Sequence, residues 1–159
     1  MIKTYWLHRL SGGLVVAAAV VGLLRLGAAA PVQAQGAASL QGNWVLRGWG
    51  EPGNLRPPVP GSTITANFEG DRLAGSSGCN NYGTRYEVQN SRLSVGPIAA
   101  TRRACLSPQL SQQETQYWEA LGGLQSYSRT AAGELHLRYA TAAGSGVLVF
   151  VPEAIPGLW

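Results

Sequence analysis

Hydrophobic and polar residues alternate along most of the chain beyond residue 40, and this two-residue period predicts short β-strands. The alternation is clearest at Ile64, Ala66 and Phe68, which we expect to point into a core. The turn-forming pair Gly70-Asp71 follows this segment and predicts a hairpin. The strands expected on this basis lie within residues 40–49, 62–69, 72–77, 82–88, 93–95, 125–130, 134–139 and 146–151.

One segment instead has the three-to-four-residue spacing of an amphipathic helix. Ser107 is suited to the N-cap and Pro108 to the first helical position, and Gly122-Gly123 ends the pattern. The apolar side chains expected to cover one flank of the sheet are Leu110, Tyr117, Trp118 and Leu121. The whole pattern predicts a mainly β fold: a small antiparallel barrel of about eight strands, or a strongly curved sheet, with a single helix.

The chain before residue 40 has the pattern of an export signal. An apolar run at residues 13–24 follows Lys3 and Arg9, and Val32-Gln33-Ala34 supplies small residues for cleavage after Ala34. The alternative is an uncleaved membrane anchor, because Arg25 is an unusual end for such a run. We therefore expect a signal peptide at 1–34, a flexible tail at 35–39, the domain at 40–151 and a second tail at 152–159, with no stable membrane span after cleavage.

Charge changes this picture little. The chain carries 12 Lys and Arg against 8 Asp and Glu, but Lys3, Arg9 and Arg25 lie in the predicted signal peptide, which has no acid. The remainder is left with nearly balanced charge, which gives little electrostatic affinity for nucleic acid. We expect a periplasmic or extracellular protein that binds no nucleic acid.

The two cysteines fit export. Cys79 and Cys105 are the only ones, and in an oxidising compartment an intrachain disulfide is the expected state. It would close a loop of about 27 residues and stabilise the fold by about 3.5 kcal/mol in the chain-entropy model. The alternatives are a metal site or a cysteine nucleophile. Both lack ligands or a base, because His136 is the only histidine beyond the signal peptide.

Several short motifs occur together in the predicted domain. Gly75-Ser-Ser-Gly-Cys-Asn-Asn-Tyr82 is followed by Thr101-Arg-Arg-Ala-Cys105, and then by Glu114, Tyr117 and Leu121. Leu40-x-Gly-x-Trp44 precedes them, and Leu135-x-Leu137 and Leu148-x-Phe150 follow. This pattern, over about residues 40–151, resembles the META domain family, whose members include HslJ-like heat-shock proteins.

The resemblance implies a cracked antiparallel β-barrel with a lone helix, similar to secretin pilotins. It also implies export or association with the cell envelope, with links to heat shock, antibiotic tolerance and motility. No catalytic residues are established for the family, so none is carried over, and no cofactor or metal is expected.

The polar motif residues have two interpretations. In the structural one, Gly78 adopts a conformation that a side chain would forbid, Asn80 bonds nearby backbone, and Tyr82 places its ring in the core and its hydroxyl at the edge. A disulfide would then tie the segment before the helix to the Asn-rich turn. In the functional one, polar residues beside the disulfide form a recognition surface. The candidates are Gly78, Asn80, Asn81, Tyr82, Thr101, Arg102 and Arg103.

Few patterns in the sequence are typical of a catalytic site. His136 lies between Leu135 and Leu137 and is expected to point outward, no Gly-x-Ser-x-Gly motif occurs, and no spacing singles out a carboxylate pair among Glu51, Glu69, Asp71 and Glu87. We therefore predict a non-enzymatic envelope or secreted module that binds an envelope protein or lipid. The alternative is an inhibitor-like module that inserts residues 52–60, part of a Pro- and Gly-rich loop at 50–61, into a secreted hydrolase.

The positions of Trp49 and Trp159 indicate what kind of partner the protein contacts. Alternation places Trp44 on the core face of its strand and Trp49 on the opposite face, and Trp159 lies beyond the last strand. An exposed pair of Trp49 and Trp159 would favour contact with a lipid, glycan or protein. An apolar barrel interior open at one end would favour a lipid, whereas a filled core would shift attention to the loops.

Overall fold

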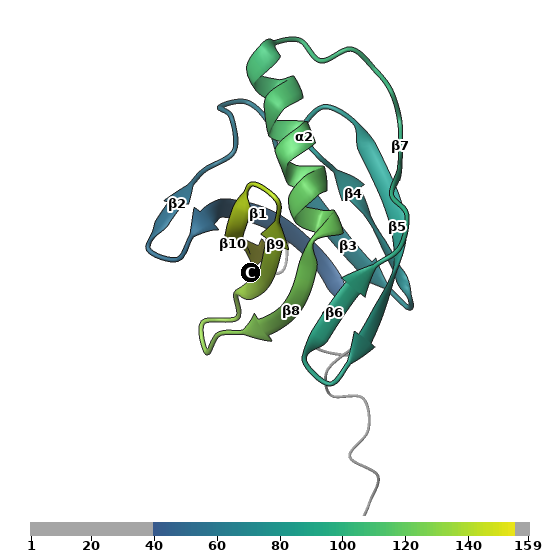
Figure 1. Ribbon diagram of the computed structural model, residues 1–159, viewed down its shortest axis with the longest axis vertical. Helices are drawn as coiled ribbons and strands as arrows, with labels where there is room; N and C mark the ends of the chain where they lie inside the picture. Colours follow the sequence, from purple (N-terminus) through teal and green to yellow (C-terminus); the bar gives the residue numbers. More distant parts are fainter. Residues whose placement is uncertain (1–39, 155–159) are drawn as a thin grey trace, which may run out of the picture. The chain divides into compact units, whose positions relative to one another are not determined.

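The computed structural model of the protein describes residues 40–154 (Figure 1). The predicted signal peptide, the 35–39 tail and Trp159 lie outside these described residues. Among the described residues, no helix is long and apolar enough to cross a membrane.

Eight antiparallel strands form a closed barrel, as predicted. Their order around it is β1-β3-β4-β5-β6-β8-β9-β10, and pairing of β10 with β1 closes the ring. The strands are β1 (Gly42–Glu51), β3 (Thr65–Glu69), β4 (Arg72–Ser76), β5 (Asn81–Gln89), β6 (Arg92–Val95), β8 (Leu124–Arg129), β9 (Leu135–Thr141) and β10 (Gly144–Pro152). The last strand begins two residues earlier than the alternation predicted, because the turn is formed by residues 142–143.

Two short strands were not predicted. β2 (Asn54–Arg56) lies within the expected 50–61 loop and pairs with the end of β1, and β7 (Ala99–Ala100) pairs with β5. A three-residue strand among prolines and glycines has too few positions for alternation to be recognised. Its consequence is a β1–β2 hairpin that projects from the barrel (Figure 1).

The barrel has one weak seam. β6 and β8 share a single residue pair, Arg92 with Ser126, supplemented by a hydrogen bond from the Tyr127 N–H to the Ser91 carbonyl (3.1 Å). In contrast, β9 and β10 pair continuously from Leu135 and Phe150 to the turn. The barrel is closed, and this seam is where its strands are least extensively paired.

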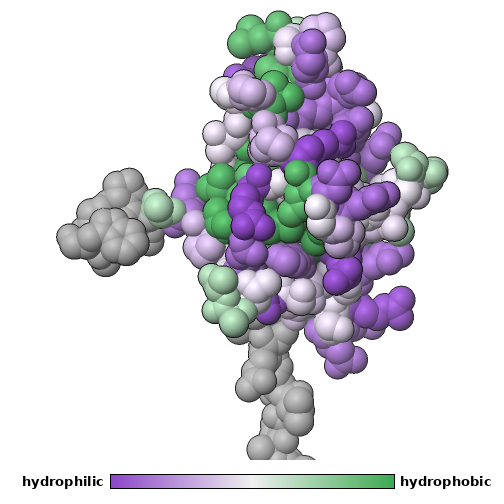
Figure 2. Space-filling view, turned by 90° about the vertical axis from the view of Figure 1, so that its left-hand side faces the viewer, coloured by the Kyte–Doolittle hydropathy of each residue, from purple (hydrophilic) through white to green (hydrophobic). Residues whose placement is uncertain are grey.

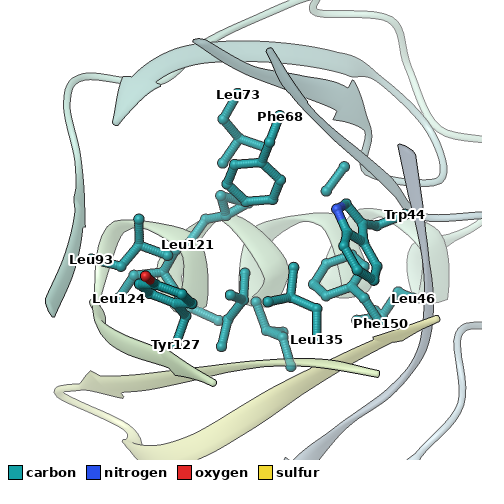
Figure 3. Packing of buried hydrophobic residues seen from close by; sticks show 14 of the residues in the cluster. Trp44, Leu46, Phe68, Leu73, Leu93, Leu121, Leu124, Tyr127, Leu135 and Phe150 are labelled. Atoms are coloured by element: carbon teal, nitrogen blue, oxygen red, sulfur yellow. The ribbon is translucent and has the colours of Figure 1, made fainter. Parts of the chain in front are cut away.

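Packed side chains fill the barrel interior (Figure 3). Ile64, Ala66 and Phe68 are buried, as their alternation predicted, and Leu135 and Phe150 belong to the same buried cluster. The filled core directs attention to the loops and the outer surface.

The prediction for Trp49 was wrong. A register shift between Leu46 and Gly48 breaks the alternation in β1, so that Trp44 and Trp49 are both only 3% exposed. A β-bulge of this kind turns the following residues to the other face of the strand. Trp49 therefore cannot form the exposed tryptophan contact that the sequence suggested.

The single described helix, α2 (Pro108–Gly122), has the predicted bounds. The Ser107 hydroxyl accepts a hydrogen bond from the Leu110 N–H (3.3 Å), and the Gly123 N–H donates to the Glu119 carbonyl (3.0 Å). Tyr117 and Leu121 are buried as expected, whereas Leu110 and Trp118 are half-buried. The buried face also contains two polar residues, Gln113 and Glu114, which position the site described next.

Candidate functional site

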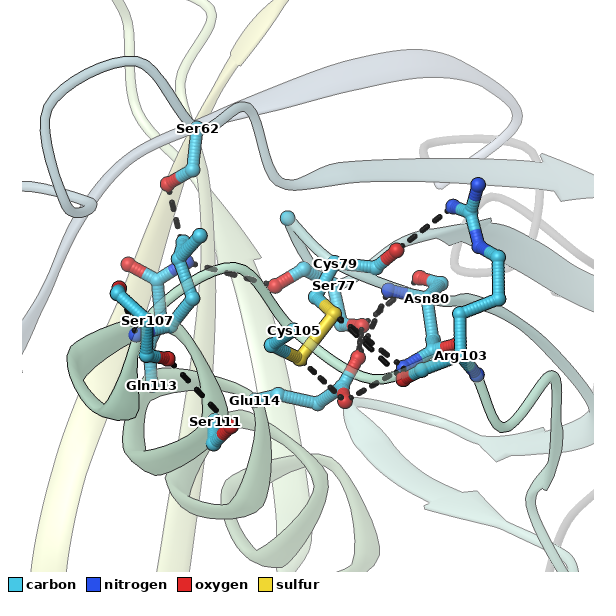
Figure 4. Close-up of a disulfide and its surroundings, with 12 residues drawn as sticks. Ser62, Ser77, Cys79, Asn80, Arg103, Cys105, Ser107, Ser111, Gln113 and Glu114 are labelled. Carbon is cyan, nitrogen blue, oxygen red and sulfur yellow. Dashed lines mark hydrogen bonds between the residues drawn. A yellow bond between two sulfur atoms is a disulfide. The ribbon is translucent and has the colours of Figure 1, made fainter.

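The disulfide lies at one corner of the barrel, beside the N-terminal half of α2 (Figure 4). Cys79 and Cys105 are bonded, which joins the turn before β5 to the loop before the helix. The predicted disulfide is therefore present. Among the described residues, the only grouping of metal-ligand side chains consists of these two sulfurs and Glu114, and the sulfurs are consumed by their bond to each other.

Glu114 is the centre of a buried hydrogen-bond network at this corner. The residue is 6% exposed, and its carboxylate accepts hydrogen bonds from the Ser77 hydroxyl, the Asn80 backbone N–H (2.9 Å) and the Asn80 Nδ2 (2.8 Å). Its Oε2 also lies 3.6 Å from the Cys105 Sγ. Because a buried carboxylate is costly without donors, these three bonds hold α2 against the Asn-rich turn.

Asn80 connects this turn to the segment before the helix. Its Oδ1 accepts hydrogen bonds from the Thr101 hydroxyl and the Arg103 N–H, both at 2.8 Å, and its Nδ2 also donates to the Arg103 carbonyl (3.1 Å). The residue is 2% exposed. The hydrogen bonds of the Asn80 side chain thus all stabilise this corner of the barrel.

Gly78 has the conformation that the sequence led us to expect. Its φ is +94°, a region that other residues adopt at a cost, and a Cβ there would lie 2.6 Å from the Gln113 Nε2. Gln113 in turn accepts a hydrogen bond from the Val59 N–H (2.6 Å) and donates to the Ser62 hydroxyl (3.0 Å). The helix is therefore bonded to the 50–61 segment as well as to the disulfide corner.

Tyr82 places its hydroxyl deeper than predicted. The hydroxyl donates to the Thr65 carbonyl (2.9 Å) and lies 2.8 Å from the Tyr117 hydroxyl, so Tyr117 must donate to Tyr82. Burial raises the pKa of both phenols well above their usual value, so both stay protonated. The pair fixes α2 to β5 inside the barrel.

The candidate motif residues therefore divide into two groups. Asn80 and Tyr82 are buried and cannot contact a partner, whereas Asn81, Thr101, Arg102 and Arg103 are exposed. The Arg103 guanidinium donates to the Cys79 carbonyl (2.7 Å). The buried members support the structural interpretation of the motif, and the exposed ones form its outer edge.

His136 lies on the barrel wall rather than in this corner. It is half-buried in β9, with its Nε2 3.2 Å from Glu134, whose other oxygen pairs with Arg47 at 2.6 Å. It is not brought near the disulfide corner.

The sequence did not reveal a groove of about 790 Å³ at the end of the barrel where β1 ends and β10 begins. Its walls are the β1–β2 hairpin, the second half of α2 and the β9–β10 hairpin. The lining residues used below are Trp49, Glu51, Arg56, Gln116, Glu119 and Tyr139. Figure 2 looks onto the side that carries β2, where hydrophilic residues cover most of the surface and hydrophobic areas are small.

Arg56 is exposed in this groove, and its guanidinium contacts two other lining residues. Its guanidinium carbon lies 4.8 Å from the centre of the Trp49 ring, and one terminal nitrogen donates to the Gln116 Oε1 (2.7 Å). Burial raises the pKa of Tyr139 on the opposite wall, and the Arg56 charge opposes that rise.

Two carboxylates share the groove with Arg56. Glu51 and Glu119 are exposed, and the ion pairs formed within residues 40–154 are Arg47–Glu134, Arg85–Asp71 and His136–Glu134. The three charges of the groove thus have no ionic partner in the described part of the chain. Only Trp49 and the Pro- and Gly-rich loop pointed to this region in the sequence, and the bulge that buries Trp49 was not recognisable there.

The chain resembles known proteins in sequence and in fold. No curated protein matches it. It is similar to the NMR structure of a protein from Burkholderia xenovorans, with 27% identity and a TM-score of 0.57 over 80% of this chain and 94% of the other. A second NMR structure, 24% identical with a TM-score of 0.53, covers 74% of this chain and 94% of its own and has the same fold. The META domain model matches residues 38–154, and the chain therefore belongs to the META domain family.

Proposed function

We propose that this META-domain protein is an exported, non-enzymatic binding module of the cell envelope, and that its partner binds in the groove around Arg56. The observation that carries the proposal is the exposed Arg56 guanidinium on a concave surface, where its contacts with Trp49 and Gln116 restrain it. A side chain that is already ordered loses less entropy when a partner binds. A role under envelope stress, which the family resemblance suggests, belongs to the same proposal.

Export is supported by two independent features. One is the apolar run followed by Val32-Gln33-Ala34 in the sequence. The other is the Cys79–Cys105 bond, because disulfides persist in oxidising compartments. Periplasmic or extracellular localisation follows from this proposal.

The absence of enzymatic activity is supported by how the polar motif is used. Glu114 and Asn80 bond other parts of the corner and are buried, and His136 lies with Glu134 on the barrel wall. A catalytic group needs access to substrate and a poised partner. These residues are better explained as supports for a rigid binding surface.

The proposal is tested by affinity capture from an envelope extract with the exported protein and its Arg56→Gln variant. We expect the wild-type protein to retain an envelope component that Arg56→Gln loses. Arg72→Gln is the matched control, because Arg72 is an exposed arginine outside the groove lining. Equal retention by all three proteins would reject the groove as the binding surface, and capture of nothing by the wild type would reject the binding role.

A second candidate function is inhibition of a secreted hydrolase by residues 52–60. The specific observation is that this proline-rich segment is anchored to α2 from within, through the Val59 N–H to Gln113 (2.6 Å) and Arg56 to Gln116 (2.7 Å). Pro57 and Pro60 remain exposed. Recovery of a hydrolase alone in the capture experiment, with loss of its activity, would favour this function.

A further inference from the structure

The charges of the groove indicate the chemistry of its ligand. Arg56 contributes one positive charge, and Glu51 and Glu119 contribute two negative ones, all without an ion pair in the described residues. The excess of negative charge disfavours polyanions such as nucleic acid. A ligand with both a negative and a positive group matches the lining better than one with a single charge.

Arg56 is suited to a carboxylate. A guanidinium has five N–H donors, and Gln116 takes one of them. The Trp49 ring covers one face of the guanidinium, so its edge is left for an incoming group. A carboxylate can accept two parallel hydrogen bonds from such an edge.

Glu119 is suited to a cationic group close to that carboxylate. It lies three residues after Gln116 on α2, and side chains at this spacing are neighbours on a helix, with about 5–6 Å between their Cβ atoms. Because Gln116 bonds Arg56, the positive charge of Arg56 and the negative charge of Glu119 lie beside neighbouring positions of α2. A short peptide with free ends carries both complementary charges.

We propose that the groove binds a short peptide with free ends, its carboxylate on Arg56 and its ammonium on Glu119. The groove volume of about 790 Å³ accommodates such a ligand, and the Tyr139 ring offers a wall for its side chains. The inference rests on the binding role proposed for the groove and specifies the ligand.

The test is a calorimetric titration of the exported protein with trialanine, whose two ends are free. We expect binding that weakens at least about tenfold in Arg56→Gln and in Glu119→Gln, the effect of losing one charge-assisted hydrogen bond. Arg72→Gln and Glu87→Gln, both exposed and outside this groove, should bind like the wild type. Circular dichroism verifies that each variant is folded.

Blocked peptides assign each end. Amidating the carboxylate should weaken binding to the wild type but not further to Arg56→Gln, and acetylating the amine should show the same relation with Glu119→Gln. No binding of trialanine, equal binding of the doubly blocked peptide, or tighter binding of the neutral sugar maltose would overturn the inference. If trialanine fails while envelope capture still depends on Arg56, the ligand class is wrong and the binding role stands. If neither depends on Arg56, both are wrong.

Discussion

Glu114→Gln tests whether the buried network stabilises the fold. The carboxylate accepts three hydrogen bonds, and bonds to a charged group contribute about 1.5–3 kcal/mol each, against about 0.5–1.5 for neutral pairs. The glutamine oxygen can keep the bonds from Ser77 and the Asn80 N–H in weakened form. Its amide then faces the Asn80 Nδ2, donor against donor. After allowance for the lower cost of burying a neutral amide, we expect a net loss of about 3 kcal/mol.

This loss is measured as the shift of the urea unfolding midpoint, with the disulfide kept intact. It is a large share of the roughly 5–15 kcal/mol that stabilises a domain. Glu119→Gln is the matched control on the same helix, because its exposed side chain should change stability by less than about 0.5 kcal/mol. A double-mutant cycle with Asn80→Ala should show coupling above about 1 kcal/mol. A loss below about 1 kcal/mol in Glu114→Gln would refute the stabilising role of the network.

Three further predictions concern the fold. Gly75→Ala should strongly destabilise the fold, because its Cβ would lie 2.1 Å from the Thr65 carbonyl oxygen. Gly83→Ala is the control, because a Cβ there meets nothing within 4 Å. Similar unfolding midpoints for the two variants would contradict the predicted clash. The folded-state pKa values of Tyr82 and Tyr117 are raised, so their contribution to stability is complete below about pH 10 and declines as the pH rises above it. Residues 40–154 contain no lysine, a residue that would also titrate near this pH. Tyr117→Phe should therefore reduce the slope with which the free energy of unfolding falls at alkaline pH. An unchanged slope would exclude the tyrosine pair as the source of this fall. Finally, alkylation of the non-reduced exported protein should label no thiol, and labelling of both cysteines would contradict the disulfide.

The elements with local signals were predictable from the sequence. The helix bounds follow from Ser107, Pro108 and the paired glycines, and the inward residues of β3 follow from strict alternation. The face of Trp49 was not predictable, because the bulge after Leu46 changes the register without leaving a recognisable residue pattern.

The site was only partly predictable. The cysteine pair and the conformation of Gly78 could be inferred, but Gln113 and Glu114 are polar and their burial depends on hydrogen-bond partners more than 30 residues away in sequence. The groove is harder still, because its three walls come from separate parts of the chain. The contact that places Arg56 in the groove is with Gln116 of α2, a residue 60 positions away in sequence.

The antiparallel pairing of β1 and β10 determines from which end of the domain the chain extends. The Glu153 N–H donates to the Asn43 carbonyl (2.9 Å), so the strands that begin and end the barrel have their outer ends side by side. At the usual rise of about 3.3 Å per residue, the opposite ends of β1 and β10, which line the groove, lie about 30 Å away. The described part of the chain thus enters and leaves the barrel at the end away from the groove. A tag joined directly before residue 40 or after residue 154 should therefore leave the groove open to its partner.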